Sequence, residues 1–148
     1  MFNVGFSYPG ISQQGQANQG QGAQNQNAQN SQQAKWQEAK QKRYNEVYQH
    51  ELAHKNAAGS LGGNIVIEQD SNGWAYGGHV NITIPGLNTE NPEETREQAL
   101  TVIKSAMAPS DPSGQDYKVA GEGRALLAAA NEQIEKNKTV GNKLDISA

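Results

Sequence analysis

The sequence predicts a small α+β domain, in which the strands and the helices are segregated along the chain. Helix-forming residues with frequent charges fill residues 35–58, and helical patterns return after residue 91. The alternation that is typical of β-strands is confined to residues 65–84, on either side of one turn sequence. Because no helix separates the two expected strands, a parallel βαβ sheet is not expected. We therefore expect a long helix, a β-hairpin and two further helices, preceded by a disordered Gln/Asn/Gly-rich tail.

The composition divides the chain into three parts. Residues 1–34 carry no charged side chain, and residues 12–34 are almost entirely Gln, Asn, Gly, Ala and Ser. Such a segment cannot bury enough apolar surface to offset the entropy lost on ordering. We therefore predict a disordered low-complexity tail over residues 1–34, a domain over residues 35–138 and a loose C-terminal tail over residues 139–148.

The overall composition excludes several classes of function. The 148 residues suit one domain, and a net charge of −3 gives no indication of a nucleic-acid partner or of an anionic membrane surface. The absence of cysteine excludes disulfides, thiol catalysis and cysteine-type zinc fingers. No apolar run approaches the ~20 residues that span a bilayer, and the N-terminus lacks the pattern of a secretory signal. We expect the cytoplasm by default and leave export by another route open.

The first expected helix, residues 35–58, contains His50-Glu51-Leu52-Ala53-His54, which matches the H-E-x-x-H pattern of zinc peptidases. Residues four apart lie on one face of a helix, so His50 and His54 can point their imidazoles at one metal ion. In such sites the adjacent glutamate, here Glu51, takes a proton from water that the metal activates. The pattern predicts a Zn²⁺ site with Glu51 as the general base. Gly59 is expected to end the helix.

The hairpin follows this helix. Ile65-Val66-Ile67 is a short β-branched run, and residues 70–73 (Asp-Ser-Asn-Gly) are typical of a turn. The second strand is expected from Trp74 to Ile84. Side chains alternate along it, with one apolar face (Trp74, Tyr76, Val80, Ile82, Ile84) and one mixed face (Ala75, Gly77, His79, Asn81, Thr83).

Two further helices are predicted by their caps. Asn91 is a good N-cap, Pro92 suits the first helical position, and Glu94 follows three residues after the cap. The apolar stripe expected for this helix consists of Leu100, Ile103 and Met107. After two prolines, Ser113 is expected to cap the third helix.

A catalytic zinc ion needs three protein ligands and an open position, so a third ligand must be found. The candidates considered are His79, Glu68, Asp70, Glu90, Glu93, Glu94 and Glu97. We favour His79, because it is the only histidine outside the motif and follows Gly77-Gly78, where a strand can bulge. Without a bulge, His79 would lie opposite the apolar face of the strand. Glu93 and Glu94 come next, although carboxylates are ordinary in a first helical turn.

A donor for the transition-state oxygen is also required. Tyr76, Tyr117, Arg96 and Arg124 could each supply it, and no pattern in the sequence ranks them.

Several short stretches, taken in order, indicate a family. They are the HELAH motif at residues 50–54, Tyr76-Gly77-Gly78 running into Val80, Pro92-Glu93 with Thr95, Ala108-Pro109, and Pro112-Ser113 with Gln115-Asp116. Over residues 45–130 the chain resembles the SprA-related family of proposed bacterial metalloproteases. The resemblance implies a zinc-peptidase helix with His50 and His54 as ligands and Glu51 as the base.

Two functions agree with these features of the sequence. The first is a zinc-dependent peptidase, in which His50, His54 and His79 hold the metal and a peptide or protein substrate adds as a strand to the edge of the hairpin. The alternative is a non-enzymatic structural or interaction module, with a closed structural metal site or none. An open fourth position at the metal favours the enzyme, whereas a fourth protein ligand favours the module.

Overall fold

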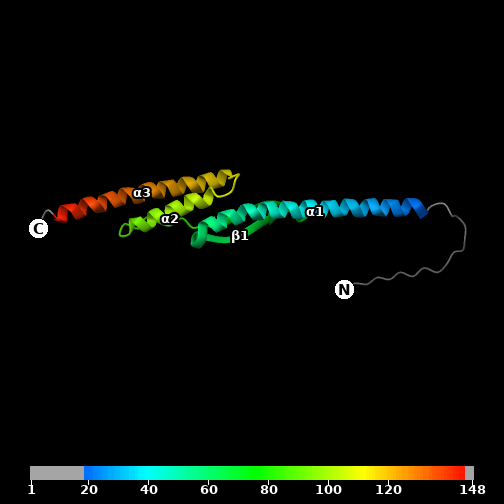
Figure 1. The fold of residues 1–148 in the computed structure, drawn as a ribbon, viewed down its shortest axis with the longest axis horizontal. Helices are drawn as coiled ribbons and strands as arrows, with labels where there is room; N and C mark the ends of the chain where they lie inside the picture. Colours follow the sequence, from blue (N-terminus) through cyan, green and yellow to red (C-terminus); the bar gives the residue numbers. More distant parts are fainter. Residues whose placement is uncertain (1–18, 146–148) are drawn as a thin grey trace. The chain divides into compact units, whose positions relative to one another are not determined.

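The computed structural model describes residues 19–145 of the chain. Its elements are α1 (Gln19–Ala58), a 3₁₀ turn η1 (Gly59–Leu61), strands β1 (Gly62–Gln69) and β2 (Ala75–Ile82), α2 (Pro92–Ala106) and α3 (Gly114–Asp145) (Figure 1). The expected α+β class is confirmed, with three helices and one antiparallel hairpin in the expected order. No helix within the described range is both long and apolar enough to cross a membrane. The chain forms two compact units, residues 1–39 and 40–148, and the candidate site lies wholly in the second.

Helix α1 begins earlier than the sequence predicted. It starts at Gln19, so residues 19–34 of the predicted disordered tail are helical, while residues 1–18 lie outside the described part. The side chains of residues 24–39 are all exposed. Their helix therefore depends on local hydrogen bonds and on the helix propensity of Gln and Ala, and not on burial. The prediction of disorder depended only on how little apolar surface this segment can bury. It therefore did not include a helix that forms without burial.

The C-terminal part of α1 buries one face. Val47, Glu51, His54 and Ala58 are 7%, 5%, 3% and 1% exposed, and their spacing of three and four residues places them along one side of the helix. The helix ends at Ala58, and Gly59 adopts a positive φ of 55°, as expected of a residue that terminates a helix. The buried face of α1 thus carries a carboxylate and an imidazole.

The hairpin turn is built by Asp70. Its side-chain Oδ1 accepts hydrogen bonds from the backbone N–H groups of Asn72 and Trp74, each at 2.9 Å. Helix α1 also holds this end of the hairpin, because the Lys40 ammonium donates to the carbonyl of Asn72 at 2.9 Å. Arg43 Nε donates to the carbonyl of Ala75 at 3.3 Å. The turn and the start of β2 are therefore fixed to α1.

A bulge lies at Tyr76 and changes the expected faces of β2. Glu68 pairs with Gly77 and Gln69 pairs with Ala75, so Tyr76 is the extra residue. Ala75 is therefore buried and Tyr76 is 64% exposed, the reverse of the expected alternation. The bulge precedes the glycine pair and does not fall within it. His79 consequently stays on the face opposite Gly78, Val80 and Ile82.

Gly78 brings β2 close to α1. A Cβ atom at this position would lie 2.9 Å from Val47 Cγ1, from Glu51 Cγ and from the backbone oxygen of Val66. These separations are shorter than van der Waals contact, so a side chain does not fit. The glycine therefore lets the strand lie directly against the helix at Glu51.

Helices α2 and α3 form a helical pair with a core of small residues. Val102, Ala99 and Ala106 of α2 and Ala120 and Ala130 of α3 are fully buried. The buried side of α2 is thus shifted by one position from the expected stripe, and Leu100 is 43% exposed. The small side chains let the two helices approach closely, which larger ones would prevent.

Both expected N-caps are present. Asn91 accepts from the backbone N–H of Glu94, and Ser113 Oγ accepts from the backbone N–H of Asp116. Helix α3 continues past the residue where a loose tail was expected and ends at Asp145. Exposed ion pairs of Lys136 with Glu132 and of Lys138 with Glu135 lie in its C-terminal half, where local pairing supports the helix.

Candidate metal centre

The two histidines of the motif turn the same ring nitrogen toward each other. His50 and His54 lie one turn apart on α1, and their Nε2 atoms are 3.3 Å apart. The two rings meet at an interplanar angle of 72° with centroids 5.0 Å apart. The predicted pairing of these imidazoles on one face of the helix is therefore present.

Each histidine is oriented through its other nitrogen. His54 Nδ1 lies 2.9 Å from the backbone oxygen of Ser105, in α2, and His50 Nδ1 lies 3.2 Å from a carboxylate oxygen of Asp111. A carbonyl and an ionised carboxylate can only accept, so each Nδ1 carries the hydrogen. The lone pair of each neutral imidazole is then on Nε2, as in metal-binding histidines whose second nitrogen is held by an acceptor.

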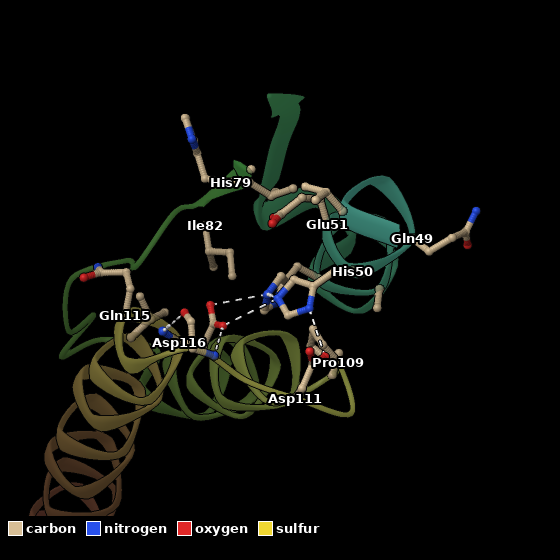
Figure 2. Close-up of a pocket in the computed structure, with 18 of the residues that line it drawn as sticks. Gln49, His50, Glu51, His79, Ile82, Pro109, Asp111, Gln115 and Asp116 are labelled. Carbon is tan, nitrogen blue, oxygen red and sulfur yellow. Dashed lines mark hydrogen bonds and ion pairs between the residues drawn. The ribbon is translucent and has the colours of Figure 1, made fainter. Parts of the chain in front are cut away.

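Asp116 completes the group from α3. Its carboxylate Oδ1 lies 3.3 Å from His54 Nε2, and its Oδ2 lies 3.8 Å from His50 Nε2 (Figure 2). The side chain is held in place by a reciprocal cap, because the backbone N–H of Ser113 donates to Oδ2 at 2.6 Å. Asp116 is thus fixed by the first turn of α3.

These three residues could hold a metal ion. Their ligand atoms all lie within 4.8 Å of one another. Tetrahedral zinc with bonds of about 2.0–2.1 Å requires ligand atoms about 3.3 Å apart. The Nε2 atoms of the two histidines and Asp116 Oδ1 with His54 Nε2 match that separation at 3.3 Å, while the other Asp116 oxygen, Oδ2, lies 3.8 Å from His50 Nε2. In addition, three atoms that carry lone pairs face one another here, an arrangement that a cation or a proton must stabilise.

Glu51 lies beside the two histidines and is almost fully buried. It is 5% exposed and is enclosed by the close approach of Gly78. Burial raises the pKa of its carboxyl above the ordinary value, while the neighbouring His54 and His50 act in the opposite direction. A buried carboxylate with a raised pKa suits a general base that must later return its proton.

His79, the favoured third ligand, is not part of this group. Its Nδ1 lies 3.5 Å from Glu68 Oε1, and its side chain is 47% exposed. Figure 2 shows it directed away from His50 and Asp116. Among the described residues the only metal-type group consists of His50, His54 and Asp116, so none of the carboxylates considered from the sequence joins the histidines.

Asp116 was not among the ligand candidates, because in the sequence it stands out only as part of a stretch that resembles the family, Gln115-Asp116. The signal was its position three residues after Ser113, which marks a carboxylate held at a helix start. That pattern is ordinary in helices, and nothing in it shows that the start of α3 faces α1. The place of Asp116 beside the histidines follows from tertiary packing.

A cleft of ≈1170 Å³ opens over the histidines and Asp116. Helix α1, strand β2, the segment that leads into α3 and the first turns of α3 line it, and β2 contributes every residue from 77 to 82. No residue of β1 lines the cleft, so the cleft follows the edge of β2 that faces away from β1. None of the four candidate transition-state donors, Tyr76, Tyr117, Arg96 and Arg124, lines it.

Comparisons with known proteins agree with the resemblance seen in the sequence. Neither the curated proteins nor the solved structures contain a match to this chain. The model of the SprA-related family matches residues 10–147, which is nearly the whole chain. The protein therefore belongs to the SprA-related family.

Proposed function

We propose that the protein is a zinc-dependent peptidase, with His50, His54 and Asp116 as the zinc ligands and Glu51 as the general base. The observation that carries the proposal is the convergence of two Nε2 atoms and a carboxylate at separations of 3.3–3.8 Å, next to a buried glutamate. Three ligands leave one tetrahedral position for water or substrate, as in catalytic zinc sites. Zinc bound here would polarise a carbonyl group and raise the acidity of water.

The protein side chains have distinct tasks in this reaction. Asp111 and the Ser105 carbonyl hold the two imidazoles in the tautomer that presents Nε2. Glu51 accepts the proton of the attacking water and passes it to the amine that leaves when the peptide bond breaks. A positioned acid–base group of this kind contributes typically about 10²–10⁴-fold to the rate.

The edge of β2 suits a peptide in extended form. The sheet has only β1 and β2 in the described part of the chain, so the edge along the cleft has no neighbouring strand there. A substrate strand can add to this edge through main-chain hydrogen bonds. Such pairing would hold a peptide or protein substrate along the cleft and over the zinc ligands.

Metal analysis combined with a hydrolysis assay tests the proposal. We expect one zinc ion per chain and cleavage of some members of a broad peptide library. Glu51→Gln should keep the zinc and lose at least about 100-fold of the activity, because only the base is removed. His54→Ala should lose both. His79→Ala, which changes a histidine outside the ligand group, is the matched control for metal binding and should keep the zinc.

Two results would count against a peptidase. A zinc-loaded protein that cleaves nothing in the library, or a Glu51→Gln variant that cleaves as well as the wild type, would favour the non-enzymatic module. That module has either a closed metal site with a fourth protein ligand or no metal. The described residues bring together three, which supports the open site.

A further inference from the structure

The cleft is not uniform along β2, and the difference bears on which peptides it accepts. Contacts with α1 give the positions along the strand. Arg43 of α1 donates to the carbonyl of Ala75, at the start of β2. Further along both elements, Val47 and Glu51 lie against Gly78. Ala58, at the end of α1, lies against Gly62, and Gly62 pairs with Ile82 at the end of β2. Helix α1 and β2 therefore run in the same direction. The metal ligands of α1 lie level with the second half of the strand.

The first half of β2 faces charged side chains. Arg43 and Glu46 both line the cleft, and their side chains form an ion pair at 3.5 Å. Each is about half exposed, so the pair is solvated and contributes little to stability. This end of the cleft suits a polar segment of a bound peptide.

The other end is lined by three aliphatic side chains, Ile82, Ile84 and Val119, which we call the aliphatic wall. Ile82 is the last residue of the half of β2 that lies level with the ligands, and Ile84 follows two residues later. Val119 is three residues after Asp116 and so lies on the same face of α3. Figure 2 shows Ile82 on the side of the pocket that faces Asp116. All three are only half-buried and line the cleft, so they present apolar surface to it.

We propose that the aliphatic wall is a specificity subsite, which selects peptides with an aliphatic side chain next to the scissile bond. This inference rests on the proposed peptidase function. A strand on the edge of β2 projects alternate side chains to one face, and the residue next to the scissile bond on this side meets Ile82 and its neighbours. Burying one aliphatic side chain there strengthens binding by roughly 10–100-fold.

Two acidic residues provide the competing outcome. Glu46 and Glu122 also line the cleft, and a substrate selected by their charge would carry Lys or Arg next to the scissile bond. Glu122 lies one turn beyond Val119 and is exposed, so solvent screens its charge. Along α3, Val119 of the aliphatic wall lies closer to Asp116 than Glu122 does. For this reason we prefer an aliphatic side chain, and not Lys or Arg, next to the scissile bond.

The first test is cleavage-site mapping with the zinc-loaded protein and a peptide library. We expect Leu, Ile, Val or Met to be enriched at one position adjoining the cleaved bond. Matched peptides with Leu or Lys there should differ at least about 10-fold in kcat/KM. Ile84→Glu should reduce that ratio about 10-fold or more and improve the Lys peptide. Leu87→Glu is the control, because Leu87 is an exposed residue nearby that does not line the cleft, and it should leave the ratio unchanged.

A binding measurement separates this inference from the proposed function. Two peptide hydroxamates that differ only in a Leu or a Lys side chain are titrated against the zinc-loaded protein by calorimetry. The Leu compound should bind at least about 10-fold more tightly in the wild type and lose that advantage in Ile84→Glu. Equal affinities, or tighter binding of the Lys compound, would overturn the aliphatic subsite even if peptides are cleaved. Absence of all cleavage together with a Leu preference in binding would instead contradict the peptidase alone.

Discussion

At the scale of single residues, the candidate metal centre brings together two imidazoles of α1 and one carboxylate of α3. The spacing of His50 and His54 placed both imidazoles correctly, because it depends only on the helical repeat. The third ligand depends on which element packs against α1, and that is set by tertiary contacts far apart in the chain. A bulge was expected to carry His79 toward the histidines, but it lies at Tyr76 and leaves His79 facing Glu68. Asp116 takes the position beside the imidazoles.

The affinity for zinc should depend on Asp116 and Asp111 and not on His79. Asp116→Asn should weaken zinc binding at least about 100-fold, because a charged ligand is lost while the amide oxygen can still accept from Ser113. Asp111→Ala should weaken it about 10–100-fold through the orientation of His50. Competition with a coloured chelator measures both, with His79→Ala as the unaffected control. A loss in His79→Ala as large as that in Asp116→Asn would return His79 to the ligand set.

Glu51 should also affect the free energy of unfolding of the metal-free protein. Burial raises the pKa of its carboxyl, so the folded protein binds a proton there more readily than the unfolded chain does. This group therefore stabilises the fold at low pH, and the contribution is lost as the pH rises through the raised pKa. In chelator at pH 7, Glu51→Gln should keep or raise the free energy of unfolding, by up to about 1 kcal/mol. Urea titrations at pH 7 and pH 4 measure it, and the advantage of the variant should shrink at pH 4.

At the scale of elements, β2 is positioned by one glycine. Gly78→Ala would place a Cβ atom 2.9 Å from Val47, from Glu51 and from the backbone oxygen of Val66. The backbone oxygen cannot move aside easily, so we expect a loss of about 1–3 kcal/mol in stability. Gly77→Ala is the matched control in the same strand, since its Cβ would meet only the end of the Glu68 side chain at 3.3 Å. Equal losses in the two variants would show that the contact with α1 is not the cause.

The elements themselves were predictable where local signals decide them. The caps at Asn91 and Ser113 and the turn at residues 70–73 follow from side chains that bond to nearby backbone. The end of α1 at Ala58 follows from Gly59, which adopts a positive φ. The start of α1 at Gln19 was not predictable from burial, because the side chains of residues 24–39 are exposed and their helix depends on helix propensity. The buried side of α2 also differed, since small residues and not the largest apolar ones contact α3.

At the scale of the whole molecule, the candidate site joins parts that are distant in sequence. His50 and His54 come from α1, Asp116 comes from α3, and the Ser105 carbonyl that orients His54 comes from the end of α2. A direct link supports this meeting point, because the Ser105 hydroxyl donates to the backbone oxygen of His54 at 3.0 Å. A metal ion held here would therefore tie α1 to the α2–α3 pair.

Zinc should consequently stabilise the folded protein as a whole. A ligand that binds only the folded state adds RT ln(1 + [L]/Kd), which is about 2.7 kcal/mol at a free concentration of 100 times Kd. We expect the thermal midpoint to rise with zinc and to return when a chelator is added. His54→Ala should abolish the rise, whereas Glu51→Gln should retain it, since its ligands are intact. A rise of equal size in His54→Ala would mean that zinc acts elsewhere, whereas selective loss in that variant would link the stability of the fold to the same three side chains.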